Sequence, residues 1–292
     1  MTAVEFGERC NDGMVIALGH FDGMHLGHRE ILAKAKQLAD ERGLKTAITT
    51  FSDSPNRKET LYTYFDRKKL FAEHGAEICV TLCYARIRNM TGEEFLHDLF
   101  AYYNIAHVVC GENYKFGADG CDVAKLRALA RGFGVGVTVM PLLDLGGVRV
   151  SSTAIKTFLK TGDVDAAKKL LGTPYHIRGE VTYGDGRGRV IGIPTANLDL
   201  PIGIMEIKRG VYGTYTLLDG KLYRSVTNYG ARPTFLQSRF AVETNILGYE
   251  GGSLHGKEIT VYFHRYLRPI RKYKNKDELL ERIAKDKEWT DL

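Results

Sequence analysis

Residues 19–28, GHFDGMHLGH, decide the fold of the first part of this chain. They lie at the end of the apolar run MVIALG (14–19) and lead into LGHREILAKAKQLADERG, which has helical periodicity. A strand that turns through glycines into a helix presents backbone N–H groups at the helix N-terminus, where anions bind. His25 and His28 are three residues apart and therefore share one helical face. The segment predicts a strand–turn–helix unit that binds a phosphate group.

Further apolar or β-branched runs follow this unit, and helical patterns separate them. They are KTAITTF (45–51), EICVTLCY (77–84), AHVVCGE (106–112) and VGVTVMPL (135–142). Strands separated by helices of this length form right-handed βαβ units and a mostly parallel sheet that is covered on both faces. Such sheets bind ligands at the carboxyl ends of their strands, and residues 19–28 follow directly after one of these ends.

The pattern changes after Gly172, which ends the helical stretch LKTGDVDAAKKLLG. From residue 175 onward the chain is strand-like with turn residues between the strands, and only KNKDELLERIAKDKEW near its end has a helical pattern. We therefore expect an α/β protein with two domains. Residues 1–172 form a Rossmann-like domain with a parallel sheet, and residues 173–292 form an antiparallel β-barrel with a terminal helix.

Length and composition agree with two folded domains and exclude several classes of protein. The chain has 292 residues, 44% of them hydrophobic and 26% charged. No window approaches the roughly 20 apolar residues of a membrane span, and the acidic N-terminus lacks a signal-peptide pattern, so we expect a cytoplasmic protein. Five cysteines without a CxxC pair argue against a disulfide framework or a zinc site.

The net charge of +6 comes mainly from residues 173–292, which carry 19 basic and 14 acidic side chains. This excess favours an anionic partner, for which a polyphosphate and a nucleic acid both qualify. The same half contains GEVTYGDGRGRVIGIPTANLDLP (179–201), a glycine-rich loop with arginines. Thr195 and Asn197 in this stretch offer the hard oxygen ligands that Mg²⁺ takes alongside substrate phosphates. The stretch is not a GxxxxGK[ST] loop, which excludes a P-loop kinase.

The first segment resembles the GxFDGxHxGH motif of the bacterial bifunctional riboflavin kinase/FAD synthetases, whose N-terminal domain belongs to the nucleotidylyltransferase superfamily. GENYKFG (111–117) and RVSSTAIK (149–156) resemble two further segments of that family. The resemblance implies that His25 and His28 are catalytic and stabilise the triphosphate of ATP. It also implies that ATP and flavin phosphate are bound by Gly19, Phe21, Asp22, Gly23, Gly27, Asn113, Arg149, Ser152, Thr153 and Lys156.

Two positions depart from the family pattern. Lys156 stands where the family usually has Arg, which keeps the charge but loses the planar fork that suits a phosphate. TFSDSP (50–55) stands where a Phe-x-Pro-His-Pro pattern is expected, so Asp53 and Ser54 replace Pro and His. Both departures concern the FAD-forming reaction, whose rate they affect more than its identity.

The second half resembles the riboflavin kinase barrel, whose signature G-x-G-R-x-[ILV]-G-[FIV]-P-T-A-N matches residues 186–197. The resemblance implies that Gly184 and Arg189 bind ATP phosphates and that Thr195 and Asn197 hold Mg²⁺. Glu243, in VETNIL, falls at the family's catalytic carboxylate. A carboxylate there would accept the proton of the ribityl 5′-hydroxyl as the γ-phosphoryl group transfers.

We therefore expect a transferase with ATP as co-substrate and Mg²⁺ as cofactor, which phosphorylates riboflavin to FMN and adenylylates FMN to FAD. Its small-molecule partners are riboflavin, FMN, FAD, ATP, ADP and pyrophosphate, with no nucleic acid or membrane, and its oligomeric state is left open. One alternative is a monofunctional FAD synthetase or riboflavin kinase in which the other domain is impaired. Another is a flavin- or nucleic-acid-binding regulator, suggested only by the basic second half.

Overall fold

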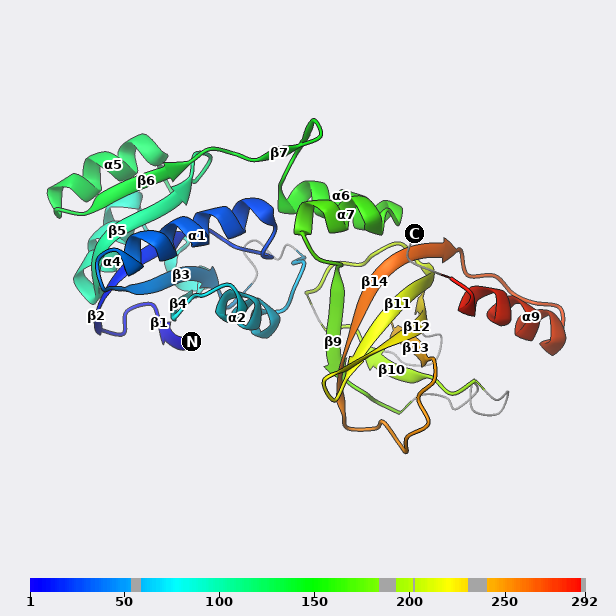
Figure 1. Cartoon of the computed structure of the whole chain (residues 1–292). Helices are drawn as coiled ribbons and strands as arrows, with labels where there is room; N and C mark the ends of the chain where they lie inside the picture. Colours follow the sequence, from blue (N-terminus) through cyan, green and yellow to red (C-terminus); the bar gives the residue numbers. More distant parts are fainter. Residues whose placement is uncertain (54–58, 184–192, 202, 231–240, 290–292) are drawn as a thin grey trace. The chain divides into compact units, whose positions relative to one another are not determined.

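The computed structural model describes residues 1–53, 59–183, 193–201, 203–230 and 241–289 (Figure 1). The chain divides into two compact units, Met1–Ser152 and Thr153–Leu292. Helices α6 (Ser152–Thr161) and α7 (Val164–Leu171) follow this division. Gly172 ends α7 in the left-handed conformation with φ 74°, as its position after the helical stretch predicted. The functional boundary at Gly172 itself stays a prediction.

The first unit is built on a six-stranded sheet in which every pairing is parallel. Its spatial order is β1-β4-β3-β2-β5-β6, so the order reverses at β2, between β3 and β5. The edge strand β1 is short and mostly exposed, and the sequence pattern did not predict it. The strands are β1 (Thr2–Glu5), β2 (Cys10–Leu18), β3 (Lys45–Phe51), β4 (Ile78–Leu82), β5 (Tyr103–Gly111) and β6 (Gly136–Met140).

Helices cover both faces of this sheet, as expected for a doubly wound fold (Figure 1). Alternate residues of β2 enter two separate cores, Met14 and Ile16 on one face and Val15 and Ala17 on the other. The first core includes buried residues of α4 and α5, and the second includes those of α1 and α2. The helices are α1 (Leu26–Asp40), α2 (Tyr64–Glu73), α3 (Tyr84–Ile87), α4 (Gly92–Tyr102) and α5 (Val123–Gly132).

The second unit is a six-stranded antiparallel sheet in the order β10-β13-β12-β11-β14-β9. Its edges meet where the backbone N–H of Thr182, just after β9, donates to the carbonyl oxygen of Asn197 in β10 over 2.8 Å. The sheet therefore nearly closes into the expected barrel. The strands are β9 (His176–Glu180), β10 (Ala196–Asp199), β11 (Gly210–Leu218), β12 (Lys221–Gly230), β13 (Ala241–Ile246) and β14 (Glu258–Arg268).

The terminal helix α9 (Lys276–Lys287) is held to the barrel by a buried ion pair and an aromatic anchor. The guanidinium of Arg268 donates to both carboxylate oxygens of Asp286, whose side chain is 1% exposed. The indole N–H of Trp289 donates to the carbonyl oxygen of Ser225 over 2.9 Å. A Cβ at Gly213 would lie 2.3 Å from the indole, so only glycine leaves room for this ring.

A short hairpin, β7 (Asp144–Leu145) with β8 (Val148–Arg149), lies near the end of the first unit.

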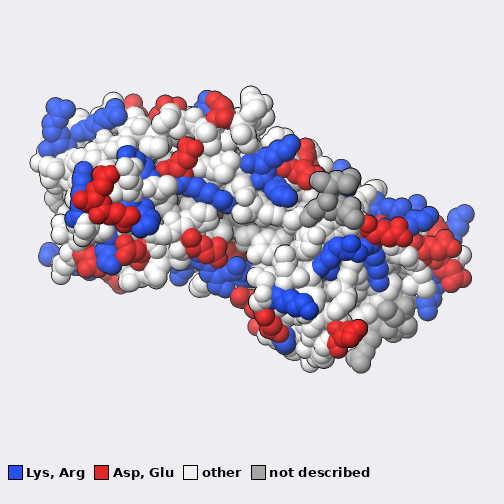
Figure 2. Space-filling model, viewed as in Figure 1, with Lys and Arg blue, Asp and Glu red and all other residues white. Residues whose placement is uncertain are grey.

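On the face drawn in Figure 2, basic and acidic side chains are interspersed over the described surface of each unit. Among the described residues, no helix is both long enough and apolar enough to span a membrane.

Candidate functional site

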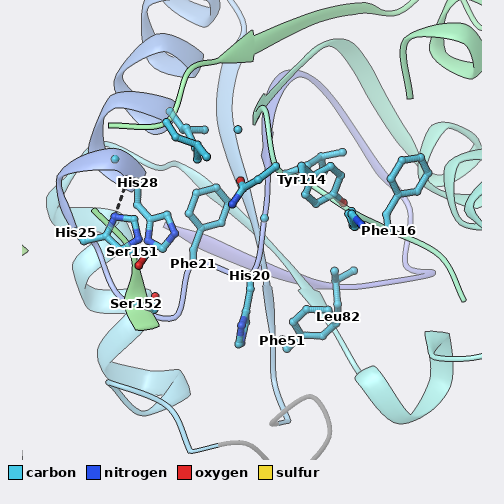
Figure 3. A pocket seen from close by; sticks show the side chains of 18 of the residues that line it. His20, Phe21, His25, His28, Phe51, Leu82, Tyr114, Phe116, Ser151 and Ser152 are labelled. Carbon is cyan, nitrogen blue, oxygen red and sulfur yellow. Dashed lines mark hydrogen bonds between the residues drawn. The ribbon is translucent and has the colours of Figure 1, made fainter. Parts of the chain in front are cut away.

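A cavity of about 670 Å³ lies at the carboxyl ends of the strands in the first unit (Figure 3). Four of its lining residues, Leu18, Phe51, Leu82 and Gly111, are the last residues of β2, β3, β4 and β5. The cavity thus lies where the strand order reverses, which is where open parallel sheets bind ligands. His25 and His28 line it together with an apolar wall that includes Phe51, Leu82 and Phe116.

His25 and His28 form a stacked pair at the start of α1. The two ring centroids are 3.5 Å apart, and the rings are inclined by 19°. His25 is the N-cap, and its Nδ1 accepts the backbone N–H of His28 over 3.2 Å. The neutral ring of His25 therefore carries its proton on Nε2. His28 instead donates its Nδ1 proton to the carbonyl oxygen of Gly23, which leaves a lone pair on its Nε2 in the neutral form.

Both imidazoles are neutral at pH 7 in the ligand-free protein. Burial lowers the pKa of His25 to about 2, and the adjacent His28 lowers it further in the same direction. Burial lowers the pKa of His28 to about 4, against the opposing effects of the Gly23 carbonyl and of Asp22. The pair therefore offers one N–H donor on His25 and, on His28, a nitrogen that becomes a donor only after protonation.

The glycines and Phe21 of the motif shape the loop that carries the histidines. Phe21 adopts φ 46° and turns its buried ring onto His28, with 4.9 Å between the ring centroids. A Cβ at Gly19 would lie 2.9 Å from the Phe21 ring, and one at Gly23 would lie 3.1 Å from Tyr62. These two glycines are therefore explained by close packing of the loop.

Asp22 is buried and accepts the backbone N–H of Leu61 on its Oδ1 over 2.8 Å, so it ties the loop to the segment before α2. Gly19, Phe21 and Gly27 line the cavity, whereas Asp22 and Gly23 lie outside the lining. Contacts of any of these five residues with ATP stay predictions.

The other predicted binders of this half divide into two groups. Asn113, after β5, and Ser152, at the start of α6, line the cavity. Arg149 is outside the described lining and pairs with Asp144 across the β7–β8 hairpin, with 2.7 Å between Nε and Oδ1. Thr153 and Lys156 follow on α6 and belong to the second unit.

Several lining residues were missed by the sequence analysis. Tyr84 and Arg88 come from the segment after β4, and Lys115 and Ser151 lie within motifs already recognised. The rule that ligands bind beyond strand carboxyl ends could have found the first two.

Asp53, in the atypical TFSDSP stretch, has a structural role. Its carboxylate accepts the backbone N–H groups of Tyr84 over 2.6 Å and Ala85 over 3.1 Å, so it caps α3 and positions Tyr84. Ser54 lies outside the described residues.

In the barrel, Glu243 lies in a row of three polar residues on adjacent strands. It is opposite Asn197 on β10 and opposite Asn228 on β12. The Asn228 side-chain amide donates to Glu243 Oε2 over 3.4 Å, and the Asn197 amide donates to the carbonyl oxygen of Thr195, also over 3.4 Å. The structure therefore brings Glu243 beside Asn197, and Thr195 immediately precedes the same strand. Gly184 and Arg189 lie outside the described residues.

The donors around Glu243 fit Mg²⁺ that arrives with ATP. A hydroxyl on the exposed Thr195 and a carboxamide on the buried Asn197 are hard oxygen ligands, and they are few. Mg²⁺ commonly takes only a few protein ligands and fills its remaining positions with substrate phosphates and water.

Family models match both parts of the chain. One described as FAD synthetase matches residues 7–154, and one described as riboflavin kinase matches residues 171–291. A bifunctional riboflavin kinase/FMN adenylyltransferase of Bacillus subtilis is 32% identical over 286 residues, which are 94% of this chain and 90% of that protein. The chain belongs to the bifunctional riboflavin kinase/FMN adenylyltransferase family. The family, the enzyme class and the two folds predicted from the sequence are thereby confirmed.

Other relatives extend over the same share of the chain. The family member from Escherichia coli K12 is 31% identical over 288 residues, which are 94% of this chain and 91% of that protein. A crystal structure described as a macrolide-efflux protein from Streptococcus pneumoniae is 27% identical, with a TM-score of 0.89, and the match covers 99% of this chain and 100% of that one. Both folds of this family member therefore recur in that protein.

Proposed function

We propose that the chain carries out both reactions of its family, each in one unit. The first unit transfers the adenylyl group of ATP to FMN and releases pyrophosphate. The second transfers the γ-phosphoryl group of ATP to riboflavin and releases ADP. The observation that carries the proposal is the cavity of the first unit, in which the His25–His28 pair at a helix N-terminus shares one space with the apolar wall. Such a space suits a ligand with both a phosphate and a flat apolar ring.

In the first unit, a phosphate oxygen of FMN attacks the α-phosphorus of ATP, and the bond from this phosphorus to the pyrophosphate oxygen breaks. The phosphate is already a nucleophile, so the protein has to align two anions and stabilise the charge of the transition state. The Nε2–H of His25 donates to the polyphosphate without a change in protonation. The backbone N–H groups at the start of α1 add further donors. Phe51, Leu82 and Phe116 provide the apolar surface for a ring.

In the second unit, Glu243 accepts the proton of the ribityl 5′-hydroxyl while the oxygen attacks the γ-phosphorus and ADP leaves. The Asn197 and Asn228 side chains flank the carboxylate along the strands. Mg²⁺, which Thr195 and Asn197 would hold together with ATP oxygens, supplies neutralisation of the clustered phosphate charge.

The test is a separation of the two activities in one protein. The parent, supplied with riboflavin, ATP and Mg²⁺, is expected to form FMN, FAD, ADP and pyrophosphate, which chromatography resolves. His25→Ala is expected to lower FAD formation from supplied FMN by about 10²-fold, the scale of one preorganised donor, and to leave riboflavin phosphorylation unchanged. Glu243→Gln is expected to lower phosphorylation by about 10²–10⁴-fold and to leave FAD formation from FMN unchanged.

Matched controls separate these effects from general damage. His97, on α4, is an exposed histidine of the first unit, and Glu258, at the start of β14, is an exposed glutamate of the barrel. His97→Ala and Glu258→Gln are expected to retain both activities. A parent that forms no FAD from FMN and ATP would refute the first assignment, and one that forms no FMN from riboflavin would refute the second.

A further inference from the structure

Arg67, on α2, is a buried cation behind the wall of the first-unit cavity. Arg67 is only 2% exposed. Among the described residues, no carboxylate forms a salt bridge with its guanidinium within 4.0 Å. Its guanidinium donates through Nη1 to the hydroxyl of Thr50 over 2.6 Å and through Nη2 to the carbonyl oxygen of Phe51 over 2.9 Å. Both acceptors are neutral. Burial lowers the pKa of Arg67, and Asp22 acts in the opposite direction, but a guanidinium remains charged at any physiological pH.

A relay connects this cation to the histidine-bearing loop. The hydroxyl of Thr50, which accepts from Arg67, donates its own proton to the carbonyl oxygen of His20 over 3.0 Å. His20 and Phe51 both line the cavity. Arg67 therefore holds the backbone oxygens of two lining residues, one directly and one through Thr50. A carbonyl oxygen engaged in this way is kept from turning toward a phosphate, which it would repel.

A second contact runs from the same helix to the histidine pair. The ring of Phe71, also on α2, packs against Phe21 with 6.3 Å between centroids, and Phe21 packs in turn against His28. Displacement of α2 would therefore move the loop that carries His28. Through Arg67, α2 hydrogen-bonds to the last two residues of β3.

We propose that Arg67 is a positioning residue for adenylyl transfer, which acts through Thr50 and the backbone of residues 20 and 51. It keeps the loop oriented so that His25 and His28 meet the polyphosphate, and its buried charge favours an anion in the cavity. The inference rests on the proposed function of the first unit. Displacing a catalytic group by about 1 Å can lower a rate by about 10²-fold, so a residue that touches no substrate can have an effect of this size.

Three variants test the inference, with riboflavin phosphorylation by the same preparation as the measure of intact protein. Arg67→Met removes the cation and both hydrogen bonds, and it is expected to lower kcat for FMN adenylylation by about 10–10²-fold. Arg67→Lys keeps the charge but cannot reach both acceptors as a fork, so it is expected to recover part of the loss. Thr50→Val keeps the cation and cuts the relay to His20, and it is expected to lower kcat with little change in the KM for ATP.

Lys69→Met is the matched control, because it removes an exposed cation from the same helix and is expected to match the parent. Histidine ring ¹⁵N spectra provide a readout that does not depend on turnover. The parent is expected to show the Nδ1–H form of His28, because Nδ1 contacts the carbonyl oxygen of Gly23. This form is expected to be lost or mixed in Arg67→Met and in Thr50→Val, and restored in part in Arg67→Lys.

The outcomes are distinguishable. The inference is overturned if both Thr50→Val and Arg67→Met adenylylate FMN with a kcat within about threefold of the parent and leave the histidine spectra unchanged. If Arg67→Met does not fold, Thr50→Val alone decides, because it replaces one buried hydroxyl by a methyl group of similar size. If the parent and the control form no FAD from FMN, the proposed function of the first unit fails. The ring spectra of the variants then still decide whether Arg67 holds the loop.

Discussion

ATP binding to the first unit is expected to add one proton to the His25–His28 pair at pH 7, and His28 is the residue that takes it. In the ligand-free protein the Nδ1 proton of His28 is donated to Gly23, so its neutral Nε2 presents a lone pair. A lone pair beside a polyphosphate is repulsive, and protonation converts it into a charge-assisted donor. His25 already donates from Nε2 in its neutral form. Stacking at 3.5 Å opposes a second charge, so uptake is limited to one proton.

The size of the uptake follows from the pKa of His28, which burial lowers to about 4. At pH 7 about one molecule in 10³ is then protonated. One phosphate charge about 4 Å away contributes about 4 kcal/mol at an effective dielectric constant of about 20. Since one pKa unit corresponds to about 1.36 kcal/mol, this raises the pKa by about three units, to about 7. At pH 7 a single phosphate charge therefore gives an uptake of about 0.5 proton. Further phosphate charges raise the uptake toward about 1 proton.

Isothermal titration calorimetry in buffers of different ionisation enthalpy measures this number as the slope of observed heat against buffer enthalpy. His28→Gln keeps a neutral donor near the Nε2 position and cannot take up a proton. The slope of the parent minus that of His28→Gln therefore cancels the ionisation of ATP itself and any contribution of the second unit. His25→Gln is expected to retain most of the uptake. Between the pKa values of His28 in the free and in the bound state, ATP affinity at this site is expected to fall about tenfold per pH unit as the pH rises, and it levels off above the pKa of the bound state.

Equal slopes for the parent and His28→Gln at pH 7 would refute the reasoning. They would mean that His28 stays neutral next to the polyphosphate or that it does not face the ligand. A slope difference near two protons would refute the argument that the stacked rings share a single charge.

The remaining predictions concern the elements that support the two sites. Gly213→Ala is expected to destabilise the barrel by about 1–3 kcal/mol, because the new methyl group overlaps Trp289, and urea unfolding followed by indole fluorescence measures it. Asp286→Ala is expected to destabilise the same unit by about 3–5 kcal/mol, because it leaves Arg268 buried without its carboxylate, and an unchanged unfolding midpoint would contradict this. Asp53→Ala removes the acceptor that caps α3 and is expected to raise the KM for FMN or ATP in adenylylation several-fold, while kinase turnover in the same preparation stays constant.

Part of this protein is determined by local sequence patterns. Continuous apolar or β-branched runs placed five strands of the first sheet, because a parallel sheet covered on both faces buries every residue of its strands. Helical periodicity placed α1, α4 and α5 between them, because burial of one face selects the period. The spacing of His25 and His28 put both rings on one helical face, and Gly172 ended a helix because only glycine adopts the left-handed conformation readily. The alternation of strands and turns after residue 175 predicted the barrel in the same way.

Other features were decided only by the tertiary structure, because they depend on residues far apart in the chain. Burial lowers the pKa values of the two histidines. This burial depends on the fold and cannot be derived from residues 19–28 alone. Arg67 is 16 and 17 residues from the groups that it contacts directly, yet only the parallel pairing of β3 with β4 brings α2, which connects them, behind the end of β3. Asp53 became a helix cap through a contact across 31 residues with Tyr84.

The barrel shows the same division. The motifs identified Glu243 and Asn197 separately, and strand register aligned them with Asn228 in one row. Register is set by the packing of side chains from all neighbouring strands, and a shift by one residue would turn each of these side chains to the opposite face. The sequence by itself therefore determined which elements form and which residue types the chemistry needs. The tertiary structure decided which of them meet and in what state of protonation, because distance and burial are properties of the folded chain.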